Sequence, residues 1–125
     1  MELRVLGSSG VKVSPICLGT MLFGDQTNEK TAAAIVAMAR DAGVNFIDTA
    51  DVYVSGTSEK ITGKLIAKQR DKWVLATKVG GPFGGGVDPN QRGLSRRWIT
   101  HQLEQSLRRL RTDYIDIYYF HREDH

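Results

Sequence analysis

Four polar residues that follow predicted strands could together do acid–base chemistry. They are Asp48, Tyr53, Lys78 and His121, and they lie at or just past the ends of three successive apolar segments. In a parallel βα architecture the carboxyl ends of the strands open onto one face, where barrel enzymes place their catalytic groups. A carboxylate, a phenol, an amine and an imidazole gathered there could deliver a proton to a substrate.

The reaction that fits this set best is the reduction of a carbonyl group. An aldehyde or ketone needs a hydride on carbon and a proton on oxygen, and the acid should be poised near the working pH. A phenol ordinarily has a pKa of about 10, and a neighbouring ammonium favours its ionised form. Tyr53 is therefore the candidate acid, Lys78 would tune it, Asp48 would hold the lysine, and His121 would orient the substrate oxygen.

Each residue also has a plainer structural interpretation. Asp48 could be a turn residue, Tyr53 a loop aromatic, and His121 a core histidine with satisfied hydrogen bonds. Lys78 is the hardest to explain in that way, because it directly ends the apolar run WVLAT. The joint position of the four favours catalysis, since catalytic groups in barrels come from several strand ends.

The segments that must position these residues alternate between strand and helix patterns. Residues 1–14 predict a β-hairpin that turns at Ser8-Ser9-Gly10. We expect strands at 16–20, 44–48, 73–78 and 114–120, and helices at 28–42, 58–68 and 95–111. Thr27, Ser58 and Ser95 are the expected N-caps of the helices.

The last predicted helix and the loop before it have distinct patterns. Ile99, Leu103, Leu107 and Leu110 form an apolar stripe at helical spacing. The loop 79–94 is rich in glycine, and its GGPFGGG run (80–86) lacks the lysine and the Ser/Thr of a phosphate-binding loop. We interpret that run as a flexible rim of the pocket.

Regular alternation of strands and helices argues for parallel βα repeats. The predicted fold class is α/β, namely the first half of a (β/α)8 TIM barrel, with its first four strands, preceded by the hairpin. A whole barrel takes about 250 residues, whereas this chain has 125, so residues 1–125 are expected to form one N-terminal half barrel. A doubly wound sheet competes, but no glycine-rich dinucleotide fingerprint follows the first strand.

Composition is that of an ordinary soluble protein, with 41% apolar and 25% charged residues. No apolar run approaches the roughly 20 residues that span a bilayer, and the start has no secretory pattern. Cys17 is the single cysteine, so a cytoplasmic protein is expected. The net charge is +3, and we interpret Arg96, Arg97, Arg108, Arg109 and Arg111 as a solvated helix face. Neither nucleic acid nor membrane is an expected partner.

Four stretches carry a resemblance to a known family. DTADVYVSGTSEKITG (48–63) resembles the signature of the aldo-keto reductases. WVLATKVG (73–80) is similar to the lysine strand of that family, and RRLRTDYIDIYYFHRED (108–124) to its fourth strand with the histidine. VLGSSGVKVSPICLGTMLFG (5–24) resembles its hairpin and first strand, nearest the bacterial and potassium-channel β-subunit branch.

The resemblance implies a carbonyl substrate and an NAD(P)H cofactor, NADPH before NADH, with no metal. It implies catalytic roles for Asp48, Tyr53, Lys78 and His121 in the order given above. Gly19, Thr20, Met21 and Asp48 would lie near the nicotinamide and its ribose. Met21, Phe23, Tyr53 and His121 would line the substrate pocket, although Met21 and Phe23 could equally be packing residues. A metal cluster of His121, Glu123, Asp124 and His125 is not expected.

Most of the family's cofactor site lies after strands five to eight, which are absent from this sequence. Two other functions therefore stay open besides a reductase. One is a cofactor-binding subunit that acts on a partner protein without turnover. The other is a half barrel that self-associates through its exposed inner face and open edges, or that joins a missing C-terminal half.

Overall fold

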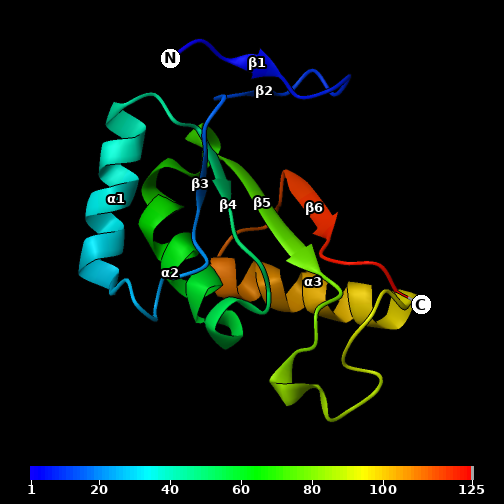
Figure 1. Cartoon of the computed structure of the whole chain (residues 1–125). Helices are drawn as coiled ribbons and strands as arrows, with labels where there is room; N and C mark the ends of the chain where they lie inside the picture. Colours follow the sequence, from blue (N-terminus) through cyan, green and yellow to red (C-terminus); the bar gives the residue numbers. More distant parts are fainter. Residues whose placement is uncertain (125) are drawn as a thin grey trace.

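A hairpin and a parallel sheet form the framework of the computed structural model, which describes residues 1–124. Strands β1 (Arg4–Val5) and β2 (Lys12–Val13) pair antiparallel. The sheet contains β3 (Cys17–Gly19), β4 (Phe46–Asp48), β5 (Val74–Val79) and β6 (Ile117–Phe120), in that order and all parallel. The hairpin lies across the end where the strands begin (Figure 1). This arrangement confirms the predicted hairpin and four consecutive parallel strands.

Three helices connect the strands of the sheet, as predicted. They are α1 (Glu29–Asp41), α2 (Thr57–Ile66) and α3 (Arg96–Leu110). Short 3-10 segments that the sequence pattern did not indicate also occur: η1 (Tyr53–Gly56), η2 (Ala67–Lys72) and η3 (Gly84–Gly86). The loop between β5 and α3 extends beyond the carboxyl ends of the strands (Figure 1).

One of the three predicted N-caps is confirmed. The Ser95 hydroxyl accepts from the Trp98 N–H at 3.1 Å. The cap of α1 is Asn28, not Thr27, because the Asn28 side chain accepts from the Thr31 N–H. Ser58 lies inside α2, after a glycine N-cap, and its buried hydroxyl donates instead to the Thr20 carbonyl at 2.7 Å. A tertiary hydrogen bond has taken the place of the local one.

The hydrophobic core fills the space between the helices and one face of the sheet. Its buried members include Ile47 and Leu75 from the strands, Val36 from α1, Ile66 from α2 and Leu110 from α3. Each such side chain contributes about 1.5–3 kcal/mol when it leaves water. This packing fixes the directions of the strands, and so the places of the residues at their ends.

The apolar stripe of helix α3 is not the most buried face of the helix. Of the expected stripe only Leu110 is fully buried, while Ile99, Leu103 and Leu107 are half-buried. The innermost face carries Trp98, Gln102 and Ser106 instead. The two stripes adjoin on the helix. The polar side chains can face inward because they meet other buried polar side chains there.

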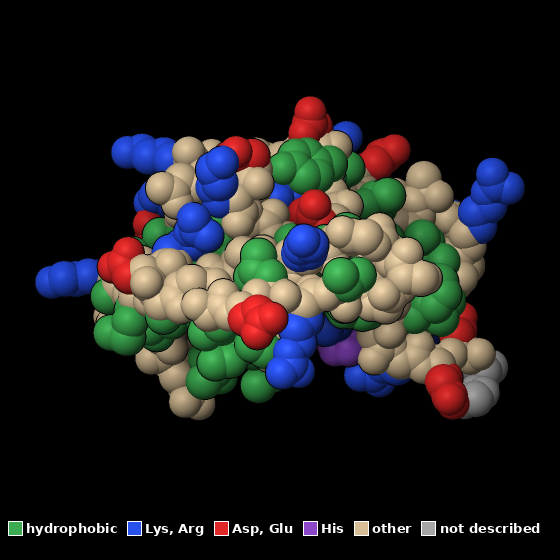
Figure 2. Space-filling model, turned by 90° about the horizontal axis from the view of Figure 1, so that it is seen from above, with side chains coloured by type: hydrophobic (Ala, Val, Ile, Leu, Met, Phe, Trp, Pro, Cys, Tyr) green, Lys and Arg blue, Asp and Glu red, His purple; other side chains and the backbone are tan. Residues whose placement is uncertain are grey.

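The opposite face of the sheet has no helix over it in the described chain. Cys17 is exposed there, Tyr119 is 38% exposed, and Phe46 and Val74 are half-buried. The edge strands β3 and β6 each pair with one neighbour only. Figure 2 shows the molecule from above, relative to the view of Figure 1. Lysine and arginine side chains there are interspersed with acidic and apolar ones. No helix among residues 1–124 is long and apolar enough to cross a membrane.

Candidate active site

The parallel register brings Asp48 and Lys78 to the same face of the sheet. Asp48 pairs with Ala76, two residues before Lys78, and Lys78 pairs with Tyr119 on the next strand. Residues two apart in a strand share a face, so both side chains point away from the helices. The Lys78 Nζ donates a hydrogen bond to Asp48 Oδ2 at 2.6 Å.

Lys78 connects several groups of the site through its amine. Its Nζ also donates to the Thr49 carbonyl at 2.8 Å and contacts the Tyr53 hydroxyl at 3.0 Å. These three partners match the three protons of an ammonium group. Burial lowers the pKa of Lys78, but the hydrogen bonds and the charges of Asp48 and Tyr53 outweigh burial and raise it above 10.5. The lysine is therefore cationic at every physiological pH.

His121 completes the cluster from the end of β6. The backbone N–H of His121 donates to the Val79 carbonyl at 2.8 Å. The imidazole meets the Tyr53 ring edge-on, with centroids 5.8 Å apart and planes at 87°. Burial, then the charges of Lys78 and Arg122, lower the pKa of His121 below 6.5. A neutral ring results, and its buried Nδ1 has no hydrogen-bond partner among the described residues.

The structure therefore brings Asp48, Tyr53, Lys78 and His121 together, as the sequence predicted. Two residues predicted to lie near a cofactor also border open space. A Cβ added to Gly19 would meet no atom within 4 Å, and Met21 is 58% exposed. Gly19 lies beside Asp48 in the register of the sheet. Gly19 therefore borders open space beside Asp48.

Two predicted ligand contacts are placed differently. Thr20 is 1% exposed, and its hydroxyl is already engaged with the Asp48 carbonyl at 3.1 Å and with Ser58 Oγ at 2.9 Å. Phe23 is 3% exposed and packs in the hydrophobic core. Thr20 thus ties β3 to β4 and α2, and Phe23 is a packing residue and not a pocket wall. In the loop after β3, Met21 and Leu22 are the exposed apolar side chains, at 58% and 40%.

A buried polar cluster behind the site was not predicted. Asp51, Glu59 and Gln102 are each at most 1% exposed, and Arg109 pairs with Glu59. Arg109 had been assigned to the solvated helix face, yet its side chain is only 12% exposed. Burial raises the pKa of Asp51 to about 6, against an opposing hydrogen bond from Gln102. Polar residues on an amphipathic helix are normally interpreted as solvated. No local pattern in the sequence therefore indicated that these side chains are buried.

Two sequence motifs remain, the glycine-rich loop and the set of residues considered for a metal. Within the 80–94 loop the Gly93 N–H donates to the Gly80 carbonyl at 3.3 Å, so the loop closes upon itself. No group of three or more His, Cys, Asp or Glu residues that could hold a metal occurs in the described part of the chain. His125, one of the four residues considered for a metal, lies outside the described residues.

Comparison with known proteins places this sequence in a family. The model of the Aldo/keto reductase family matches residues 15–125. The chain belongs to the aldo/keto reductase family. It is 47% identical over 133 residues to YrpG, an uncharacterized oxidoreductase of Bacillus subtilis, and 43% identical over 128 residues to a probable voltage-gated potassium channel subunit beta of Arabidopsis thaliana.

The solved structures of aldo/keto reductases agree with the fold. The holo form of an aldo-keto reductase from Bacillus halodurans superposes with a TM-score of 0.82 at 39% identity, over 94% of this chain and 39% of the other. Such neighbours are (β/α)8 barrels, so this chain has the fold of the first half of a barrel. It aligns over 99% of its own length with 38–41% of the length of the two curated relatives named above.

Proposed function

We propose that this chain carries the acid–base machinery of a reductase that converts aldehydes or ketones to alcohols with NAD(P)H. The observation that supports the proposal most strongly is the position of the Lys78 ammonium, which contacts both Asp48 Oδ2 and the Tyr53 hydroxyl. A buried amine between a carboxylate and a phenol has little structural purpose, whereas it suits a phenol that must release a proton.

The proposed reaction uses each of the four residues once. The substrate oxygen lies between the Tyr53 hydroxyl and the neutral imidazole of His121, which orients it. As hydride reaches the carbonyl carbon, the C=O π bond breaks and its electrons take the Tyr53 proton to form the alcohol. The Lys78 ammonium stabilises the phenolate that remains, and Asp48 keeps the ammonium in place.

The residues present suit the nicotinamide end of the cofactor. Open space beside Gly19, the exposed Met21 and the Asp48 carboxylate are where a nicotinamide and its ribose would be held. NADPH, with NADH as the alternative, supplies the hydride when bound. In this proposal the chain's own task is to place the carbonyl and to donate the proton.

The proton donor is tested by Tyr53→Phe, with Tyr119→Phe on β6 as the control tyrosine. Reduction of an aromatic aldehyde, followed by NADPH absorbance, should fall by about 10²–10⁴-fold in Tyr53→Phe. Cofactor affinity, followed by fluorescence, should stay within about twofold because the ring remains. Tyr119→Phe should keep its activity. Turnover by Tyr53→Phe at the wild-type rate would overturn the assignment of the acid.

A second candidate function is a cofactor-binding subunit that acts through a partner protein. The 43% identity to a probable voltage-gated potassium channel subunit beta favours it. The same two measurements separate the candidates. Tight NADPH binding without turnover in either the wild type or Tyr53→Phe supports the binding subunit, whereas turnover that depends on Tyr53 supports the reductase.

We further propose that the uncovered face of the sheet is covered in solution by a second copy of this chain, or by a C-terminal half barrel where one is present. Cys17 and Tyr119 lie exposed on that face, between two strand edges without partners. Open parallel edges and exposed apolar side chains favour association.

A further inference from the structure

The turn that carries Tyr53 has an unusual backbone. Val54, Ser55 and Gly56 are three consecutive residues with positive φ, at 49°, 52° and 91°. Left-handed conformations are unfavourable for residues with a Cβ, and most of all for a β-branched one such as Val54. Strain of this kind persists only where the surrounding structure holds it. Something outside the turn must therefore stabilise it.

Arg109 of α3 lies directly against this turn. A Cβ added to Gly56 would come within 2.8 Å of Arg109 Cδ, so the side chain fills the space that the glycine leaves. The Arg109 Nε donates to Glu59 Oε2 at 2.6 Å, and its Nη2 donates to Ser106 Oγ at 3.3 Å. The Glu59 Oε1 in turn accepts from Thr77 Oγ1 at 2.7 Å. This buried pair ties the turn to α3, α2 and β5.

Gln102 makes a second connection from the same face of α3. It lies two helical turns before Arg109, and its Nε2 donates to Asp51 Oδ2 at 2.7 Å. Asp51 is fully buried, and its own N–H points to the Lys78 carbonyl at 3.4 Å. These two hydrogen bonds hold Asp51, two residues before Tyr53, between α3 and the strand that carries Lys78.

We propose that Gln102 and Arg109 are positioning residues for the proton donor. Neither contacts the reacting atoms. Gln102 acts through Asp51 and Arg109 acts through Glu59 and Gly56, so the strained turn is braced on both sides of Tyr53. The inference rests on the proposed role of Tyr53 as the acid, and it adds that the distance from its hydroxyl to Lys78 is set by the inner face of α3.

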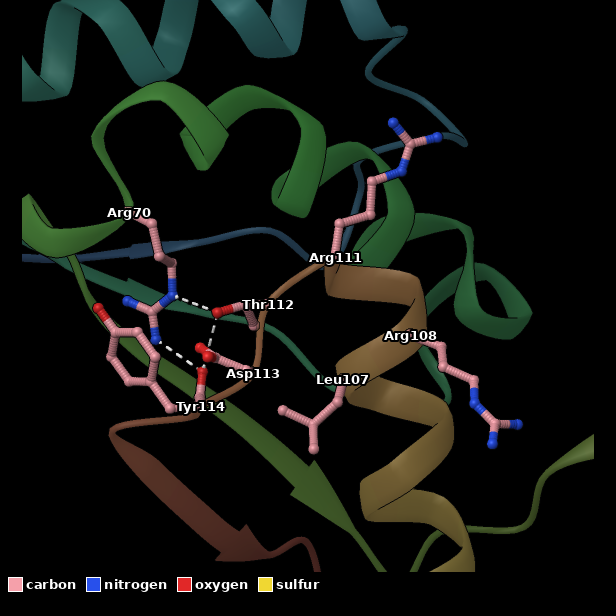
Figure 3. Close-up of a pocket in the computed structure, with 7 residues that line it drawn as sticks. All are labelled: Arg70, Leu107, Arg108, Arg111, Thr112, Asp113 and Tyr114. Atoms are coloured by element: carbon pink, nitrogen blue, oxygen red, sulfur yellow. Dashed lines mark hydrogen bonds between the residues drawn. The ribbon is translucent and has the colours of Figure 1, made fainter.

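An arginine at the other end of the sheet provides the control for stability alone. Arg70 donates from Nη2 to Asp116 Oδ2 at 2.8 Å and from Nε to Thr112 Oγ1 at 3.1 Å. Figure 3 shows its guanidinium pointing toward Thr112 and Tyr114, at the C-terminal end of α3. Its side chain is 13% exposed, close to the 12% of Arg109. Arg70→Met therefore removes the ion pair of an equally buried arginine without touching the Tyr53 turn, although its partner Asp116 is 25% exposed whereas Glu59 is fully buried.

The first readout is amide hydrogen exchange in the native chain. The N–H groups of Tyr53, Ser55 and Thr57 all have carbonyl acceptors within residues 50–54 and so report on the turn. We expect exchange at these amides to quicken about tenfold or more in Gln102→Leu and in Arg109→Met. Arg109→Lys should restore most of the protection, and Arg70→Met should leave it at the wild-type level.

The second readout is the division of the kinetic effect between kcat and KM for an aldehyde. A displaced acid should lower kcat about tenfold or more in Gln102→Leu and leave KM within about twofold. If Arg109→Met leaves Glu59 buried and unpaired and the variant does not fold, Gln102→Leu and Arg109→Lys carry the test. Wild-type exchange in Gln102→Leu, or equally fast exchange in Arg70→Met, would overturn the proposal. An inactive wild type would refute the proposed function. The hydrogen-exchange result alone would then decide whether Gln102 and Arg109 hold the Tyr53 turn in place.

Discussion

At the scale of single residues, Asp51 shows how burial sets the behaviour of a titratable group. Its carboxyl is fully buried and accepts a hydrogen bond from the Gln102 side chain. Its Oδ1 has no partner among the described residues. The charge of Glu59 raises the pKa of Asp51 and that of Arg109 lowers it. The pKa of the Tyr118 hydroxyl is raised chiefly by burial and, in addition, by the negative charge of Asp51. The net result for Asp51, led by burial, is a pKa of about 6 in place of 3.8.

Asp51→Asn should therefore stabilise the chain at neutral pH. The carboxyl of the native chain keeps its proton to a higher pH than that of the unfolded chain. This group therefore lowers the free energy of unfolding as pH rises from about 4 to about 6, and the free energy of unfolding stays lowered at higher pH. Asparagine has no charge to bury and can still accept from Gln102. Urea unfolding at pH 7.5 should show a gain of about 1–3 kcal/mol that shrinks toward pH 4. A lower stability at pH 7.5 would contradict this account.

At the scale of elements, the contact between α2 and α3 holds the polar cluster in register. Gly63 of α2 is the point of closest approach, since a Cβ there would lie 2.2 Å from the Leu110 carbonyl oxygen. The helices must move apart to admit even a methyl group, because the obstructing atom belongs to the backbone. That movement would carry Arg109 away from Glu59.

Gly63→Ala should consequently destabilise the chain by about 1–3 kcal/mol or more, despite the better helix propensity of alanine. Lys64→Ala is the matched control on the next position of α2. Lys64 is 58% exposed and pairs with Glu29 at the surface, so its loss should change stability by less than about 1 kcal/mol. Thermal unfolding of the two variants measures the difference. Equal midpoints for both would show that the helices can separate freely.

At the scale of the whole molecule, the uncovered face of the sheet should govern association. Cys17 reports on that face, because it is exposed on β3. Although the residue is exposed, partial burial of its sulfur and then the charge of Asp48 raise the pKa of its thiol to about 11, so alkylation is best followed at pH 9. If a second copy covers the face, the alkylation rate should fall about tenfold as concentration rises through dimerisation.

Tyr119→Lys places a charge on the same face and should keep the chain monomeric and Cys17 reactive at all concentrations. Size-exclusion chromatography provides the oligomeric state in parallel. A monomeric wild type whose alkylation rate does not depend on concentration would refute self-association through this face.

Local patterns in the sequence determined the strands, the helices and the four residues at the strand ends. Apolar runs closed by a charged residue, as in WVLATK, place Lys78 at the end of its strand in any parallel sheet. The register of β4 and β5 then makes the contact with Asp48 nearly unavoidable. Signals of this kind lie within a few residues of one another, so they can be read without the fold.

Only the tertiary structure decided how the Tyr53 turn is held. The bonds from Gln102 to Asp51 and from Arg109 to Glu59 join residues 51 and 50 positions apart. A glutamine or an arginine on an amphipathic helix has the same local pattern whether it meets water or a buried carboxylate. Thr20, Phe23 and Ser58 were misplaced for the same reason, because the partner that fixes each side chain comes from another part of the chain.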